Sequence, residues 1–181
     1  MRVALFGGSF NPIHVGHLMV TTWVVATDRA DECWIVPTFR HPFGKELAPF
    51  ADRVAMARAS VEGFPRVRVS EIEAERAGPS FTIDTVEALR ARNPATRFLL
   101  VVGSDVLGES PKWREWDRLK TLVELLPVRR AGVALPAEGE GPLFPEVSSS
   151  EIRSRIGRGE DVSALVPAPA LALIREKHLY R

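Results

Sequence analysis

The chain has 181 residues, of which 45% are hydrophobic, and a formal net charge of +1. This length predicts one domain spanning residues 1–181, and the apolar content excludes a disordered chain. The near-neutral charge provides no broad basic field for nucleic acid, and the single cysteine, Cys33, excludes an internal disulfide and a cysteine-based metal cluster.

The sequence starts without a basic-then-apolar leader and small-residue cleavage site, and no apolar run approaches the length of a membrane span. We therefore expect a cytoplasmic, soluble protein with no membrane partner and no nucleic-acid partner.

Strand-like and helix-like segments alternate along the chain. Apolar runs and polar–apolar alternation predict strands at residues 3–6, 32–37, 66–70, 98–102 and 144–147, with one or two more within 127–135. Apolar periodicity, caps and the need for crossovers predict helices at residues 18–26, 50–62, 83–89, 112–126, 148–153 and 168–178. Residues 98–102 are the most apolar strand and are expected at the sheet centre. The fold class is therefore α/β, a single Rossmann-like domain with a parallel sheet, helices on both faces and right-handed crossovers.

The stretch Gly-Gly-Ser-Phe-Asn-Pro-Ile-His-Val-Gly-His, residues 7–17, joins the first predicted strand to the first helix. Gly7 and Gly8 lack a Cβ, so a ligand can approach their backbone, and the helix start that follows attracts anions. His14 and His17 are three residues apart, so both can face one ligand. A tight turn and a helix cap would explain the parts separately. The whole string favours a phosphate site for nucleotide chemistry.

A loop with three basic side chains, residues 38–45, follows the second predicted strand. It contains Arg40, His41 and Lys45. An ordinary solvated surface loop is one interpretation. Its place after the carboxyl end of a strand, where ligands bind in open α/β sheets, favours a functional one.

The 7–17 string resembles the nucleotidyltransferase superfamily, whose signature is (H/T)-x-G-H after the first strand, and within it the bacterial nicotinate-nucleotide adenylyltransferases. Residues 80–85, 102–105, 111–113 and 147–153 resemble further segments of that family, in the family's order. The chain departs from the family at three places. Asn11 stands where Asp is more common, residues 41–45 replace a usual P-P-H-K loop, and Arg114 replaces a frequent Tyr.

The resemblance implies an enzyme that transfers AMP from ATP to nicotinate mononucleotide, giving deamido-NAD and pyrophosphate in NAD biosynthesis. ATP and the mononucleotide are the implied partners, and a homo-oligomer is left open. Mg²⁺ is implied as the cofactor, bound through the ATP phosphates, so no protein metal ligands are expected; the sequence shows no carboxylate cluster for a protein cage.

The resemblance also implies site residues, each at a position that matches a family motif. The catalytic residues would be His14, His17, Lys45 and Arg153. The ATP-binding residues would be Gly7, Gly8, Ser9, Phe10, His14, His17, Gly103, Asp105, Ser149, Ser150 and Arg153. The mononucleotide-binding residues would be Ser80, Phe81, Thr82, Asp105, Trp113 and Arg114.

Several of these residues could instead have a purely structural role: helix capping for Ser149 and Ser150, a solvated charge for Arg153, and a core aromatic for Trp113.

Two other functions are also compatible with parts of the sequence. A sister nucleotidyltransferase could act on nicotinamide mononucleotide, phosphopantetheine, FMN or a polyol phosphate, and a binding module could lack catalysis. The Trp113 segment and residues 80–82 argue against most sister enzymes, and the joint presence of the four catalytic candidates argues against a non-catalytic module. The sequence leaves the choice between nicotinate and nicotinamide mononucleotide open.

Overall fold

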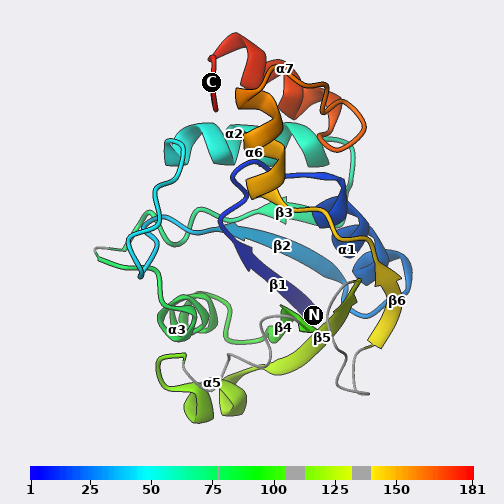
Figure 1. The fold of residues 1–181 in the computed structure, drawn as a ribbon. Helices are drawn as coiled ribbons and strands as arrows, with labels where there is room; N and C mark the ends of the chain where they lie inside the picture. The colour runs from blue at the N-terminus through cyan, green and yellow to red at the C-terminus, as the bar shows by residue number, and fades with distance from the viewer. Residues whose placement is uncertain (77, 105–112, 132–139) are drawn as a thin grey trace.

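One parallel sheet organises the computed structural model, which describes residues 1–76, 78–104, 113–131 and 140–181. Its strand order is β3-β2-β1-β4-β5-β6, and each neighbouring pair runs parallel (Figure 1). The strands are β1 (Arg2–Gly8), β2 (Glu32–Pro37), β3 (Val67–Val69), β4 (Arg97–Gly103), β5 (Glu124–Arg130) and β6 (Glu140–Phe144).

Helices cover both faces of this sheet, which confirms the expected α/β fold (Figure 1). The described helices are α1 (Val15–Ala26), α2 (Phe50–Val61), α3 (Thr82–Arg92), α5 (Trp116–Leu122), α6 (Ser149–Gly157) and α7 (Ala168–Glu176). Successive side chains of β1 point to opposite faces. Ala4 therefore joins the core under α1, α2, α6 and α7, whereas Val3 and Leu5 join the core under α3 and α5.

The strand order reverses beside β1, which pairs with β2 on one side and β4 on the other. The five residues 98–102 of β4 are all buried, as expected for a central strand. The helix after β1, α1, packs in one core, and the helix after β4, α5, packs in the other, so these two connections leave the sheet toward opposite faces. In open α/β sheets such a reversal leaves a crevice at the carboxyl ends of the two strands, where ligands bind.

The predicted boundaries that differ most from the structure lie around β5 and β6. The helix expected through Leu126 ends at Leu122, and β5 begins at Glu124. The strand expected at 144–147 is β6, which covers 140–144 and ends where the prediction began. The strand expected in 132–135 lies outside the described residues, as do Asp105 and Lys112.

The C-terminal helix α7 packs on α2, so the end of the chain lies beside an early element (Figure 1). An ion pair between Lys177 and Asp52 joins the two. Among the described helices, none is long and apolar enough to cross a membrane.

Cys33 tests the packing of the sheet. Its side chain has no exposed surface, and burial raises the pKa of its thiol to about 12. Because the thiolate is the reactive form, we expect an aromatic disulfide reagent to label the native chain very slowly and the denatured chain at one thiol per molecule. Rapid stoichiometric labelling of the native chain would contradict this packing.

Candidate active site

A cavity of about 230 Å³ lies at the carboxyl ends of β1, β4 and β5. It joins segments from distant parts of the sequence: the 7–17 motif with the first turns of α1, the ends of β4 and β5, Trp113, and residues 144–147. Its lining residues are Phe6, Gly7, His14, Gly16, His17, Val20, Val101, Val102, Gly103, Trp113, Val128, Phe144, Pro145 and Val147. The structure therefore brings together the predicted residues Gly7, His14, His17, Gly103 and Trp113.

The two imidazoles of the motif stack on each other at the start of α1. Their ring centroids are 3.6 Å apart and their planes differ by 21°. The backbone N–H of His14 donates to Nδ1 of His17 at 3.1 Å. Because Nδ1 accepts this bond, the hydrogen-bond network assigns the proton of the neutral ring to Nε2. The N–H of His17, a residue of the cavity lining, is therefore on Nε2 in the neutral ring.

Phe10 supports His17 from the core side. Its ring contacts the His17 ring edge-on at 4.8 Å between centroids, and it packs against Phe6 at 5.6 Å. Phe10 has a left-handed backbone, with φ of 44°, which is uncommon for a bulky residue. A Cβ on Gly8 would lie 3.3 Å from the Phe10 ring. Gly8, Ser9 and Phe10 thus shape the turn, and they are absent from the described cavity lining.

Two glycines keep the motif open and correctly packed. A Cβ on Gly7 would meet no atom within 4 Å, so the backbone of this cavity residue is open to a ligand. A Cβ on Gly16 would lie 3.2 Å from Cε1 and Nδ1 of His14. Gly16 therefore leaves the room that the His14 ring occupies.

The N-terminus of α6 is bonded to the motif. Ser149 Oγ donates to the Pro12 carbonyl at 2.9 Å, and Nη1 of Arg153 donates to the Asn11 carbonyl at 2.8 Å. Arg153 Nη2 also donates to Ser150 Oγ at 3.3 Å. Arg153 thus holds the motif backbone in addition to any contact with phosphate, through one of the five N–H donors of its guanidinium.

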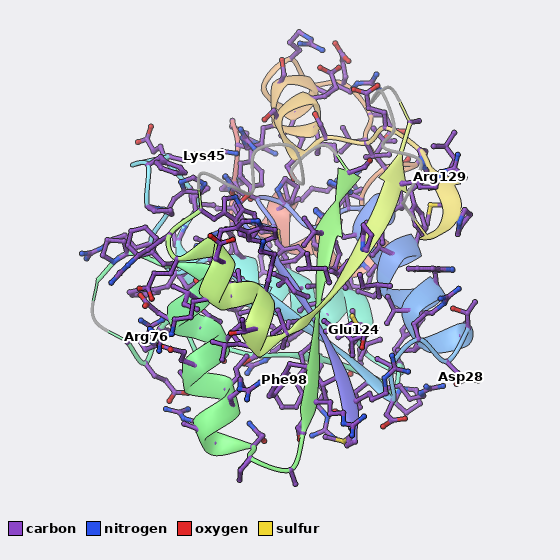
Figure 2. The ribbon with its side chains drawn as sticks, turned by 90° about the horizontal axis from the view of Figure 1, so that it is seen from below. Asp28, Lys45, Arg76, Phe98, Glu124 and Arg129 are labelled. Atoms are coloured by element: carbon purple, nitrogen blue, oxygen red, sulfur yellow. The ribbon has the colours of Figure 1, made fainter. Side chains whose placement is uncertain are left out.

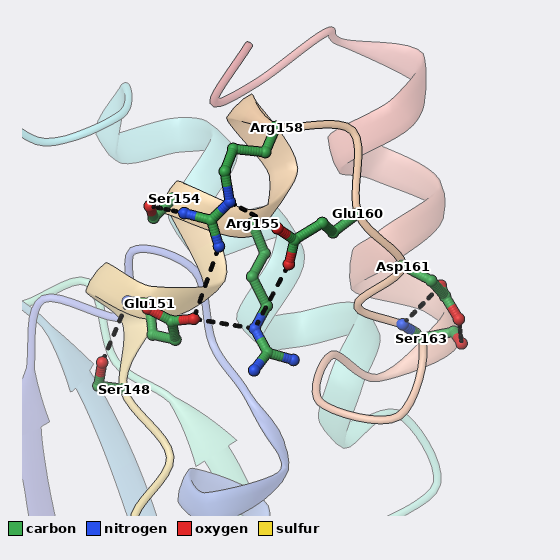
Figure 3. Close-up of polar contacts among 8 residues, drawn as sticks. All are labelled: Ser148, Glu151, Ser154, Arg155, Arg158, Glu160, Asp161 and Ser163. Carbon is green, nitrogen blue, oxygen red and sulfur yellow. Dashed lines mark hydrogen bonds and ion pairs between the residues drawn. The ribbon is translucent and has the colours of Figure 1, made fainter.

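The other arginines of this segment belong to a separate surface network (Figure 3). Arg155 donates to Glu151 at 2.9 Å, and Arg158 forms ion pairs with Glu151 and Glu160. Ser148 caps α6 by accepting from the Glu151 N–H, as its sequence position predicted. The bonds drawn for this network in Figure 3 do not involve Arg153.

Arg53 is a positioning residue that the sequence analysis missed. It is 1% exposed, and its guanidinium donates to the carbonyls of Ser9 at 2.7 Å, Thr38 at 2.8 Å and Ala48 at 2.9 Å. Burial lowers the pKa of Arg53, while the nearby Tyr180 and Glu73 act in the opposite direction. One buried side chain thus joins the loop after β1 to both ends of the loop after β2.

The loop after β2, residues 38–49, places Lys45 outside the central cavity. Lys45 lines a shallower hollow with Arg40, His41 and neighbouring loop residues. Figure 2 shows it at the same end of the molecule as Arg129, near the carboxyl end of β5. Burial, and then the Lys45 ammonium, lower the pKa of His41, so its imidazole is neutral at pH 7. Arg40, Lys45 and the buried Arg53, which also lines this hollow, therefore carry its positive charge.

The start of the 38–49 loop is bonded to the segment before α3. Ser80 Oγ accepts from the N–H groups of Phe39 and Arg40, both at 3.1 Å, and the Ser80 N–H donates to the Arg40 carbonyl at 2.9 Å. The buried Glu73 accepts from Phe39 N–H at 3.0 Å and from Thr85 Oγ1 at 2.9 Å. The Ser80 amide is therefore engaged within the protein.

Trp113 and Arg114 contact different neighbours. Trp113 lines the cavity and contacts Trp116 edge-on at 5.8 Å. Arg114 lies over the Phe81 ring at 5.0 Å and forms an ion pair with Asp84 at 3.5 Å. The charge of Arg114 is thus partly balanced beside the start of α3.

The described part of the chain contains no group of three or more histidine, cysteine or carboxylate side chains placed to hold a metal ion. The described cavity lining offers imidazoles, backbone and apolar groups, with no carboxylate among them. Such a lining suits an anionic ligand that brings its own cation.

Comparisons with known proteins show the family of this chain. The cytidylyltransferase-like family model matches residues 5–155. A probable nicotinate-nucleotide adenylyltransferase from Anaeromyxobacter dehalogenans (strain 2CP-1) is 48% identical, over 99% of this chain and 97% of that protein. This chain belongs to the nicotinate-nucleotide adenylyltransferase family. A family member from Bacillus pumilus (strain SAFR-032) is 36% identical, over 99% of this chain and 98% of its own length.

The fold of this family member also matches a solved structure. The Plasmodium falciparum nicotinic acid mononucleotide adenylyltransferase complexed with NaAD superposes with a TM-score of 0.85 at 20% identity, covering 99% of this chain and 97% of that one. This likeness supports the α/β architecture derived above.

Gly16→Ala tests whether the stacking of the two histidines matters to this adenylyltransferase. The new methyl must displace the His14 ring by a few tenths of an ångström. Alanine favours helix by about 1 kcal/mol over glycine, so unfolding free energy should change by less than about 1 kcal/mol. Turnover should fall by about tenfold, because small misplacements of catalytic groups are costly.

The matched control is Gly157→Ala in α6, where a Cβ would meet only the Tyr180 carbonyl at 3.7 Å. It should be as stable and fully active. Equal turnover for the two variants, measured beside chemical unfolding curves, would show that the His14 position is unimportant.

Proposed function

We propose that the chain transfers the adenylyl group of ATP to nicotinate mononucleotide, with release of pyrophosphate. The observation that carries this proposal is the stacked pair His14 and His17 at the start of α1, in the same cavity as Gly103 and Trp113. This arrangement offers phosphate-binding donors and a flat aromatic surface within one crevice at the sheet reversal.

In the proposed reaction, a phosphate oxygen of the mononucleotide attacks the α-phosphorus of ATP. The bond between that phosphorus and the oxygen bridging to the β-phosphate breaks, and pyrophosphate leaves with the bonding electrons. Phosphoryl transfer of this kind depends on positioning and charge stabilisation more than on covalent catalysis. The Nε2–H of His17 would donate to an oxygen on which charge accumulates. His14 holds His17 in this orientation through its backbone N–H.

The remaining predicted ATP contacts come from two sides. The start of α6, with Ser149, Ser150 and Arg153, lies against the motif and would bind the β- and γ-phosphates. Lys45 would reach the phosphates only if the 38–49 loop moved toward the cavity, because the structure places it in a separate hollow. Asp105, a predicted contact with ribose hydroxyls, follows directly after the described residues Gly103 and Ser104.

Mg²⁺ would enter with ATP, held by phosphate oxygens and water. This fits the donor set, because the described cavity lining has no carboxylate that would form a protein cage. The ion would supply positive charge to the phosphates.

The pyridine ring would stack on Trp113, whose electron-rich indole suits a flat, partly cationic ring. Phe81 and Thr82, at the start of α3, would direct backbone N–H groups to the pyridine carboxylate, with Arg114 adding positive charge. The Ser80 N–H has an internal acceptor, so Ser80 would contribute by holding the loop.

Pyrophosphate release from ATP, measured with each mononucleotide separately, tests the proposed reaction. We expect release with nicotinate mononucleotide, and His17→Ala should lower turnover by about 10²–10³-fold, by analogy with the loss of one oxyanion donor. ATP affinity should change much less. Release with neither mononucleotide would contradict the proposal, and release only with nicotinamide mononucleotide would reassign the substrate.

Trp113→Ala tests the pyridine site. Stacking of a base on an aromatic side chain contributes about 1–3 kcal/mol, so the Michaelis constant for the mononucleotide should rise by about 5–150-fold while that for ATP stays near normal. Arg114→Ala should instead weaken the preference for nicotinate over nicotinamide mononucleotide. If Trp113→Ala only lowers the melting temperature, the ring packs in the core and the pyridine ring binds elsewhere.

A further inference from the structure

Asn11 connects the motif to three other parts of the chain, through its side-chain amide and its backbone carbonyl. Its side chain is 2% exposed, and its Oδ1 accepts two hydrogen bonds. One comes from the Ala48 N–H at 3.1 Å and the other from the Tyr180 hydroxyl at 2.8 Å. The backbone carbonyl of Asn11 accepts from Arg153. The motif is thus bonded to the 38–49 loop, to α6 and to the C-terminal tail.

The tail after α7 is fixed by contacts of its own. After α7 ends, the Leu179 N–H donates to the Ile174 carbonyl at 3.0 Å, and Lys177 pairs with Asp52 on α2. The Tyr180 ring packs against the larger core. Its backbone is left-handed, with φ of 65°, a conformation that side chains adopt only when the surroundings hold them there.

The phenol faces a charged environment and stays a donor. Burial raises the pKa of Tyr180, with the guanidinium groups of Arg53 and Arg153 acting against the shift and the Asp52 carboxylate adding to it. The hydroxyl is therefore protonated at neutral pH and can donate to Asn11.

We propose that Tyr180 is a positioning residue for adenylyl transfer, which acts by fixing Asn11 and, through it, the path of residues 11–14 that sets His14 against His17. The inference rests on the proposed function. The connection runs from the tail to Asn11, along the backbone to His14, and through the His14 N–H to Nδ1 of His17. Oδ1 also accepts from the Ala48 N–H, so the position of the Asn11 side chain is linked to that of the 38–49 loop as well.

Tyr180→Phe tests this proposal because phenylalanine keeps the ring and its apolar contacts while removing the hydroxyl. Turnover should fall by about fivefold, the equivalent of one neutral hydrogen bond. The Michaelis constant for nicotinate mononucleotide should change by less than about twofold, because the pyridine site is untouched. All assays are run well below each variant's unfolding midpoint, so that the folded fraction is the same.

Two further comparisons separate positioning from general support of the fold. Lys177→Met removes the other anchor of the same tail without touching Asn11, and it should lower the melting temperature but leave turnover unchanged. In an Asn11→Ala background, Tyr180→Phe should have almost no further effect, because its acceptor is gone. If Asn11→Ala does not fold, Asn11→Asp replaces it: the carboxylate keeps an acceptor, so the fivefold loss should persist.

The inference is overturned if Tyr180→Phe turns over like the unmodified chain, if Lys177→Met loses as much turnover, or if the loss is unchanged in the Asn11→Ala background or disappears in Asn11→Asp. These outcomes leave the proposed reaction standing, because the unmodified chain is assayed in parallel. Absence of pyrophosphate release from the unmodified chain contradicts the proposed function itself.

Discussion

Hydrogen bonds from other parts of the chain hold the 7–17 motif in place. The most important donor is the buried guanidinium of Arg53. Burying such a charge is costly unless its donors are satisfied, and here three backbone carbonyls accept from it. Those carbonyls belong to the two loops that follow β1 and β2. Arg153 and Ser149 hold the motif from α6 in the same way. The turn that carries the histidines is therefore preorganised by α2, α6 and the tail, which lie along one face of the sheet (Figure 1).

This arrangement explains how a small α/β domain can perform phosphoryl transfer with few chemically reactive groups. A parallel sheet places the ends of β1, β4 and β5 side by side, and the strand reversal opens a crevice there. Stabilisation of a charged transition state requires donors that do not reorganise during the reaction. We propose that the stacked His14 and His17, with Gly16 leaving room for the first ring, provide such fixed donors.

Local sequence patterns predict most of the helices and strands and the residues of the 7–17 motif. Contacts between residues far apart in the sequence could not be predicted from such patterns. The motif, the apolar β4 and the cap of α6 have local signals. Leu119, Leu122 and Leu126 match a helical repeat, which extended the predicted helix too far. Leu126 in fact belongs to β5, where Leu126 and Val128, two residues apart, are both buried on one face of the strand.

Arg53 was not predicted as a site residue because an arginine on an amphipathic helix usually reaches solvent. The bond from Tyr180 to Asn11 joins residues 169 positions apart, and neither residue signals the other.

A crystal structure of the chain with deamido-NAD would test most directly whether the motif is preorganised to bind phosphate. The pyrophosphate group should lie within hydrogen-bond distance of Nε2 of His17 with the pyridine ring stacked on Trp113. The backbone of residues 9–14 should superpose on the ligand-free form within about 1 Å, with the Arg53 hydrogen bonds intact. A dinucleotide bound away from the histidines, or a motif that rearranges and breaks the Arg53 bonds on binding, would contradict this view of the site.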